Sequence, residues 1–276
     1  MPKSWFASKT DPNGEATHYE DGCHPSEAAA LKTYLKQHTS PQEAAHAITH
    51  FTSSSLTPRE ELPRLWSLLQ DALVELPETT LDRLIALMSA IEDLPNPPSV
   101  PLANNNPATR FWKDSPAFGH LWSDMSPSYE WRRTLEASSG SRRTAVCESL
   151  VRRAEVEARL VSAGLAGLEI HGGFEVVADA LESSGSIREV EVSSVARWME
   201  WCGGQMKMAA QRGEGSWALE RSETGARRDL WRKPGDGVGE MTLDRWRFWE
   251  GRLREMQDDP VVARDAKRAL EAMGKF

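Results

Sequence analysis

The residues best suited to acid–base chemistry are His120 and Asp124, which lie four positions apart inside an aromatic segment. On a helix this spacing brings the two side chains together. A carboxylate beside an imidazole fixes the tautomer of the ring and raises its pKa, so the pair is a candidate general acid and base. The alternative is an ordinary charge pair on a helix surface, because pairs at this spacing are routine.

Tryptophan is the second unusual feature, since the chain has 11 Trp and only 3 Tyr. We interpret six of them as walls of a cavity for an apolar ligand: Trp112, Trp122, Trp131, Trp198, Trp201 and Trp231. Many Trp also share helical spacing with Leu and Met, which is typical of core side chains. Trp217 and Trp231 fall in the Gly-rich segment 213–239, which could be anchored to the body or act as a lid.

No metal or cofactor site is predicted. His46 and His50 lie four residues apart, but the apolar side of their helix faces the other way, so we expect a solvated pair. The N-terminal cluster of metal-ligand types fits no zinc spacing; its members are His18, Asp21, Cys23 and His24. The sequence lacks GxSxG, GxGxxG, P-loop and HExxH motifs, and His171-Gly172-Gly173 is interpreted as a turn.

Helices must position these residues, because apolar side chains recur every three or four positions and no segment alternates with period two. The pattern predicts helices over 25–38, from Ser40 onward, and over 58–76, 80–93, 141–163, 174–182, 193–211 and 242–273. Gly203 and Gly204 weaken their helix by roughly 1 kcal/mol each unless another segment must approach closely there. We therefore predict an all-α protein, an irregular multi-helix bundle of about ten helices.

The C-terminal segment 242–273 has the strongest pattern. One apolar stripe precedes Asp259 and Pro260 and a second follows them, which predicts a helical hairpin with Asp259 as the cap of its second helix. The stripes are Leu243, Trp246, Trp249, Leu253 and Met256, then Val262, Ala266, Ala269 and Met273.

Residues 1–23 lack a clear period and are predicted to be a tail, which Trp5 and Phe6 could dock. Residues 24–276 are predicted to form a single all-helical domain. The segment 94–107 contains five prolines and three consecutive asparagines, so it is the alternative position for a division of that domain.

Composition narrows the possible partners. The net charge of −8, with Lys and Arg interleaved with Asp and Glu, argues against nucleic-acid binding. Three widely spaced cysteines indicate reduced thiols, and no apolar run is long enough to cross a membrane. We expect a soluble cytoplasmic protein without a membrane partner, and its oligomeric state stays open.

Several short motifs follow one another along the chain, namely Leu65-Trp66 with LLQDALVELP, the block 112–118, Glu157–Leu160, Trp201 with Gly203, and Arg245–Trp249 with Ala266, Ala269 and Met273. In this order they resemble the fungal family DUF3632, a domain of unknown function. The similarity spans most of residues 25–273. It implies a fungal, helical, intracellular protein, and it brings no catalytic residues or mechanism with it.

Two functions agree with these observations. The first is a cofactor-independent enzyme of fungal specialised metabolism, of the cyclase or isomerase type, that binds an apolar small molecule in the Trp-rich cavity. The second is a non-catalytic helical module that binds another protein. An enclosed cavity of at least about 300 Å³ near the aromatic block would favour the enzyme. An exposed apolar patch of several hundred Å² would favour the interaction module.

Overall fold

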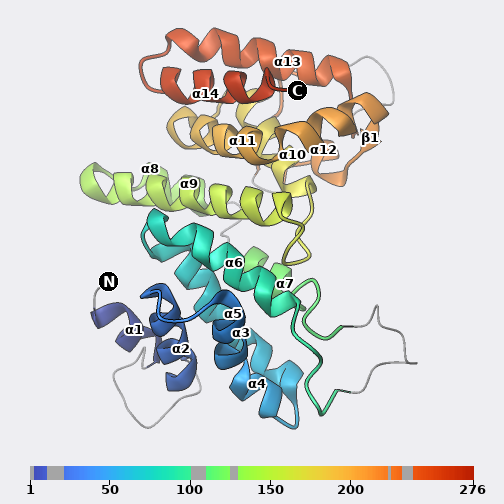
Figure 1. The fold of residues 1–276 in the computed structure, drawn as a ribbon. Helices are drawn as coiled ribbons and strands as arrows, with labels where there is room; N and C mark the ends of the chain where they lie inside the picture. Colours follow the sequence, from blue (N-terminus) through green and yellow to red (C-terminus); the bar gives the residue numbers. More distant parts are fainter. Residues whose placement is uncertain (1–2, 11–21, 101–109, 125–129, 223–224, 232–238) are drawn as a thin grey trace. The chain divides into compact units, whose positions relative to one another are not determined.

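The computed structural model describes residues 3–10, 22–100, 110–124, 130–222, 225–231 and 239–276. Within these ranges the chain forms fourteen α-helices and one two-stranded antiparallel ribbon (Figure 1), which confirms the all-α prediction. The same ranges contain no helix that is both long and apolar enough to cross a bilayer.

The chain divides into two compact units. Unit 1 comprises residues 1–126 together with 164–168, and unit 2 comprises residues 127–163 and 169–276. The sequence places the alternative division at 94–107, of which 101–109 lie outside the described residues. The structural division comes later, and the short segment 164–168 returns to unit 1.

Unit 1 is built on α5, whose apolar stripe is buried as predicted. Leu65, Trp66 and Leu73 have no measurable exposure, and Leu62 and Leu69 are nearly as buried. Ser40 is the N-cap of α3 and forms a capping box, because its hydroxyl accepts from the Glu43 amide while the Glu43 carboxylate accepts from the Ser40 amide. The helices are α1 (Lys3–Thr10), α2 (Pro25–Leu35), α3 (Pro41–Ile48), α4 (His50–Ser54), α5 (Pro58–Glu75), η1 (Glu78–Thr80), α6 (Leu81–Glu92) and α7 (Phe118–Asp124).

The predicted tail contains a docked helix. In α1, Phe6 is buried, and Trp5 Nε1 donates a hydrogen bond of 2.7 Å to Glu75 Oε2. Lys9 Nζ, at the end of α1, lies 2.7 Å from Asp71 Oδ2. Residues 11–21 lie outside the described ranges, so the prediction of a tail is untested there.

A buried carboxylate holds the segment 164–168 in unit 1. Glu92 Oε1 accepts hydrogen bonds from Ser115 Oγ at 2.9 Å and from the Ala166 amide at 2.7 Å. Lys113 Nζ lies 3.0 Å from Glu92 Oε2 and balances the charge. A buried carboxylate with three donors is fully satisfied, so Glu92 fixes two separate chain segments to the end of α6.

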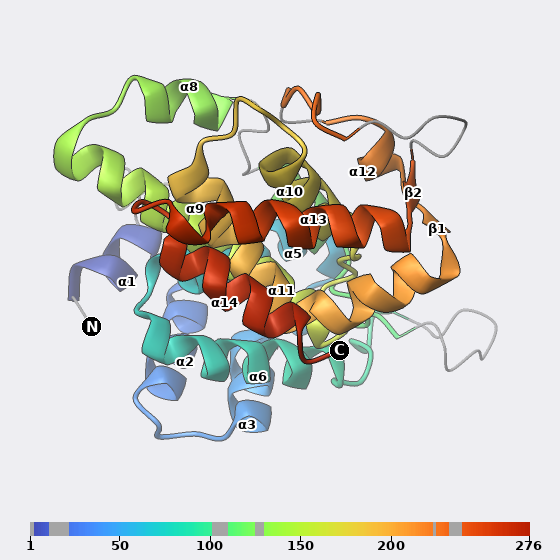
Figure 2. The same cartoon turned by 90° about the horizontal axis from the view of Figure 1, so that it is seen from above.

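Unit 2 contains the longest helices. Figures 1 and 2 show α13 and α14 side by side along α11. Its elements are α8 (Glu130–Glu136), α9 (Gly140–Ser162), α10 (His171–Leu181), α11 (Arg188–Arg212), β1 (Glu214–Gly215), α12 (Trp217–Glu220), β2 (Glu240–Met241), α13 (Leu243–Glu255), η3 (Met256–Asp258) and α14 (Ala263–Met273).

The predicted C-terminal hairpin is confirmed as α13 and α14, and both apolar stripes are buried except at Leu243. The predicted cap is wrong in position, because α14 begins at Ala263. Asp259 instead orders the preceding turn, where its Oδ1 accepts from the Val261 amide at 3.0 Å. Its other carboxylate oxygen pairs with Arg188 at 2.8 Å.

An ion pair lies in the core of unit 2. Arg245 donates from Nε to Glu182 Oε1 at 2.6 Å and from Nη2 to Oε2 at 2.7 Å, and neither side chain is more than 1% exposed. Trp249 Nε1 donates to Glu182 Oε1 at 2.7 Å. The pair therefore joins the end of α10 to α13 through three charge-assisted hydrogen bonds.

Candidate functional site

Three of the six Trp residues that the sequence predicts as cavity walls are core side chains. Trp112, Trp122 and Trp198 are at most 2% exposed. In unit 1, Trp112 packs edge-on against Trp66 with ring centroids 6.3 Å apart, and Trp122 stacks on Phe118 at 5.9 Å. These rings are enclosed by neighbouring side chains, so their role in this structure is packing.

The other three Trp residues belong to unit 2 and differ in exposure. Trp131 and Trp231 are half-buried, and Trp231 packs on Phe248 with centroids 5.1 Å apart. Trp201 is 42% exposed, and the Arg159 guanidinium lies 4.5 Å from its ring centroid. Among the six, Trp201 is the most exposed residue.

His120 and Asp124 lie on α7, as their spacing predicts, and both are exposed. General acid–base chemistry requires a pocket that holds the substrate against the pair. Both side chains lie on the surface of a seven-residue helix, and among the described residues no hydrogen bond or ion pair joins them, so the role of the pair stays a prediction.

The described part of the Gly-rich segment is tied to α10. Arg228 Nε donates to Asp179 Oδ1 at 2.7 Å, and the Leu230 amide donates to the Glu182 carbonyl at 2.8 Å. Asp229 accepts from the amide and hydroxyl of Ser184. These bonds support anchoring for residues 225–231, whereas 223–224 and 232–238 lie outside the described ranges.

A serine–histidine pair escapes the sequence analysis. His171 Nδ1 lies 2.8 Å from Ser216 Oγ, and His171 Nε2 lies 3.6 Å from Glu169 Oε2. This order resembles a nucleophile, a base and an acid, but Ser216 is only 5% exposed. Its hydroxyl also accepts from the Ala218 amide at the start of α12. We interpret the pair as a tie between α10 and α12.

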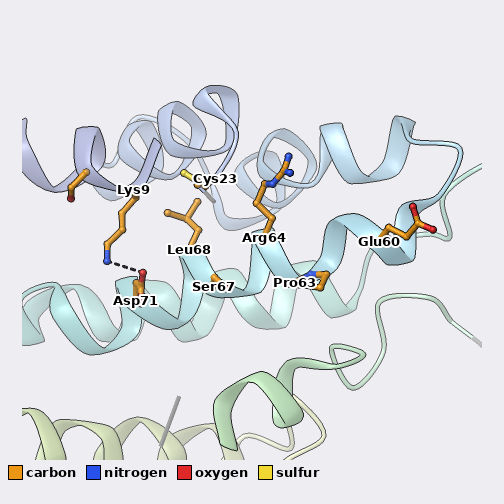
Figure 3. A pocket seen from close by; sticks show the side chains of 10 residues that line it. Lys9, Cys23, Glu60, Pro63, Arg64, Ser67, Leu68 and Asp71 are labelled. Atoms are coloured by element: carbon orange, nitrogen blue, oxygen red, sulfur yellow. Dashed lines mark hydrogen bonds and ion pairs between the residues drawn. The ribbon is translucent and has the colours of Figure 1, made fainter. Parts of the chain in front are cut away.

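A pocket of about 410 Å³ lies in unit 1 between α5 and the segments that carry Lys9 and Cys23 (Figure 3). None of the six predicted Trp is among its described lining residues. The α5 wall includes Glu60, Arg64 and Asp71, which follow one another at helical spacing on one side of the helix. That polar stripe can be read in the sequence, but the opposite wall comes from a distant segment.

A cluster of charges lies at one end of this pocket (Figure 3). Lys9 Nζ pairs with Asp71 at 2.7 Å and with Glu75 at 2.9 Å. Burial raises the pKa of the Asp71 carboxyl. Burial would lower the pKa of Lys9, but the hydrogen bonds of its ammonium group to Asp71 and Glu75 raise that pKa above its usual value. Burial also raises the pKa of the Cys23 thiol to about 12, so this part of the wall is neutral.

An apolar surface lies on α11 of unit 2. Trp201, Met208 and Phe276 are 42%, 50% and 53% exposed, and we call these three residues the α11 surface. A methyl group on Gly203 or Gly204 would lie 3.1 or 2.9 Å from ring atoms of Phe276. The two glycines therefore accommodate the Phe276 ring, which is the close approach that their position in the helix predicts.

In the described parts of the chain, no three His, Cys, Asp or Glu side chains gather closely enough to hold a metal ion. His46 and His50 are both exposed, as predicted. Two members of the N-terminal cluster, His18 and Asp21, lie outside the described ranges.

Comparison with known proteins identifies the family. The model described as Protein of unknown function (DUF3632) matches residues 66–253, which is more than half of the chain, so the chain belongs to this family. The resemblance seen in the sequence is thereby confirmed. No curated protein and no solved structure matches the chain. The matched residues include the buried Glu182–Arg245 pair, whereas much of the unit 1 pocket precedes them.

Proposed function

We propose that this DUF3632 protein is a non-catalytic interaction module, and that unit 2 binds another protein through the α11 surface. The observation that carries the proposal is the exposure of Trp201 and Met208 on α11, whose other apolar residues are buried, together with that of Phe276, which follows α14 and lies against Gly203 and Gly204 of α11. Isolated apolar side chains on a surface need no explanation, but a group of three large ones is typical of a binding site.

Helix geometry places Trp201 and Met208 on the same face of α11. Gly204 follows Trp201 by three residues and precedes Met208 by four, so the three positions lie on one face. The Phe276 ring lies against Gly204, whose position on the helix falls between those of Trp201 and Met208. With side-chain areas of about 200 Å² each, the exposed fractions amount to roughly 300 Å².

The partner that fits best is an amphipathic helix. The row from Trp201 to Met208 is roughly 10 Å long, which corresponds to two turns of a partner helix. Such helices place apolar side chains at positions i, i+3 or i+4 and i+7 into a matching row. Trp201 is the expected anchor, because Trp residues dominate the energetics of many interfaces.

The cyclase or isomerase hypothesis has weaker support. Trp112, Trp122 and Trp198 serve in core packing, and the acid–base candidates His120 and Asp124 are exposed. An apolar substrate, a role in specialised metabolism, fungal origin and a cytoplasmic location therefore stay predictions.

The proposal is tested by comparing two surface variants in the native host. The tagged triple variant Trp201→Ser, Met208→Ser and Phe276→Ser removes the α11 surface. The control Leu56→Ser removes an apolar side chain that is 92% exposed in unit 1. We expect one partner to copurify in stoichiometric amount with the wild type and with the control. The amount that copurifies with the triple variant should be at least tenfold lower.

Circular dichroism should show the same helix content for all three proteins, because every substituted side chain is exposed. Recovery of the same partner by the triple variant would contradict the proposal. If the protein instead forms a dimer, and the triple substitution dissociates that dimer, then the partner of the α11 surface is a second copy of the chain and not another protein.

A further inference from the structure

We propose that the pocket of unit 1 binds a small zwitterion, namely an α-amino acid with an apolar side chain. The inference is independent of the α11 surface, which belongs to unit 2. It rests on the charges along α5, on their hydrogen bonds and on the neutral middle of the pocket.

Arg64 is the cation of the pocket wall that α5 supplies. Its guanidinium group has five N–H donors. Among the described residues its ion-pair partner is Glu61, at 3.7 Å, and no hydrogen bond to the guanidinium is found there. Figure 3 shows Arg64 extending from α5 toward the opposite wall. A planar carboxylate is the group that such a fork binds best, because it accepts two parallel hydrogen bonds.

Glu60 lies one turn before Arg64 on α5 and also lines the pocket. Side chains at this spacing commonly form a salt bridge. In the described structure the two groups are not paired with each other within 4.0 Å, although both line the pocket. A ligand that carries an ammonium group next to a carboxylate can complete both, with the ammonium at Glu60 and the carboxylate at Arg64.

The charge around the pocket excludes a simple anion. Lys9 and Arg64 face four carboxylates on or beside the pocket wall, namely Glu60, Glu61, Asp71 and Glu75. A phosphate or a dicarboxylate would bring further negative charge into this group. A ligand with no net charge avoids that repulsion and still binds Arg64.

The middle of the pocket sets the side chain of the ligand. Leu68 and the neutral thiol of Cys23 lie between Arg64 and the Lys9–Asp71 pair, whereas Pro63 lies between Arg64 and Glu60 (Figure 3). An aliphatic side chain would run along Leu68 and Cys23. A volume of 410 Å³ lies within the range of small-molecule sites and accommodates an amino acid of the size of leucine.

The test is a titration of the full chain with L-leucine, in which nuclear magnetic resonance signals of the protein and of the ligand report binding. The comparison ligands are 4-methylpentanoate, which lacks the ammonium, and 3-methylbutylamine, which lacks the carboxylate. We expect saturable binding of leucine in the millimolar range or tighter, and at least tenfold weaker binding of either comparison ligand.

Two substitutions locate the site. Arg64→Gln and Glu60→Gln should each weaken leucine binding at least tenfold. The control is Arg59→Gln, which removes a cation from the same helix but outside the pocket lining and should leave the affinity unchanged. Both pocket residues are accessible to solvent, so we expect the variants to fold, which their circular dichroism will verify.

Several results would overturn the inference. They are the absence of saturable binding up to 10 mM leucine, an unchanged affinity of Arg64→Gln, and equal binding of 4-methylpentanoate. The last result would leave an anion site without selection for a zwitterion. None of these outcomes depends on whether the α11 surface has a partner.

Discussion

The buried pair of Glu182 and Arg245 makes the strongest prediction about stability. Replacing either residue alone by Leu leaves the other charge in a core position that is at most 1% exposed. Loss of one partner of a buried ion pair costs about 3–5 kcal/mol. Glu182→Leu also deprives Trp249 Nε1 of its acceptor, which adds about 1–3 kcal/mol.

The double variant Glu182→Leu with Arg245→Leu removes both charges. Replacing a buried ion pair by apolar side chains of similar volume is often close to neutral. The unpaired N–H of Trp249 then remains as the main loss, about 1–3 kcal/mol. We therefore expect the double variant to be more stable than either single variant, with a coupling energy of at least about 3 kcal/mol.

Urea unfolding and hydrogen exchange together provide the measurement. Urea unfolding, followed by Trp fluorescence, gives the free energy of unfolding for the wild type and the three variants. Hydrogen exchange measured by mass spectrometry should localise the loss of protection to α10 and α13 of unit 2. Additive effects of the two substitutions, or a loss below about 1 kcal/mol in Arg245→Leu, would refute the reasoning.

Two further predictions concern unit 1 and the packed glycines. Burial raises the pKa of Glu27 from 4.5 to about 7, so this group favours the fold when protonated, and its contribution is lost as the pH rises through 7. In Glu27→Gln the side-chain oxygen can still accept the hydrogen bond from the His24 backbone amide. Thermal melts should show that this variant is more stable than the wild type by up to about 3 kcal/mol at pH 8 and no more stable at pH 4. Gly173→Ala places a methyl 2.5 Å from the core ring of Trp198 and should cost about 1–3 kcal/mol. Gly204→Ala meets only the exposed Phe276 ring, which can swing aside, so chemical denaturation should show no loss or a gain of up to about 1 kcal/mol; equal losses at the two glycines would contradict this account.

The helices that the sequence predicts well are those with a full apolar stripe. In α5 and α13 the stripe repeats over several turns, and burial of that face determines the helix. The short helix α1 has almost no apolar pattern. It is held by contacts with α5, such as Trp5 with Glu75 and Lys9 with Asp71, which no local rule reveals.

The candidate sites are harder to predict than the helices. The type and spacing of a Trp residue are the same in a core and in a cavity wall, and only the tertiary partners distinguish Trp112 from Trp201. Similarly, the polar stripe of α5 is visible at Glu60 and Arg64, but the pocket exists only because Cys23 and α1 lie opposite. Gly203 and Gly204 of α11 are the exception. Glycine lowers the stability of a helix, so two glycines in its middle predict that another segment approaches closely there.

Because residues 164–168 return to unit 1, the protein cannot be cut into its two units at one position, and neither unit is encoded by one continuous stretch of the gene. The chain passes from one unit to the other three times, so a single cut releases neither unit whole. A fragment beginning at residue 127 would carry Ala166 without its acceptor Glu92 and would expose an amide that is now satisfied. Genetic exchange of one unit would likewise need more than one junction. The two units are therefore expected to have evolved as one inherited piece, in keeping with a family match that begins in one unit and ends in the other.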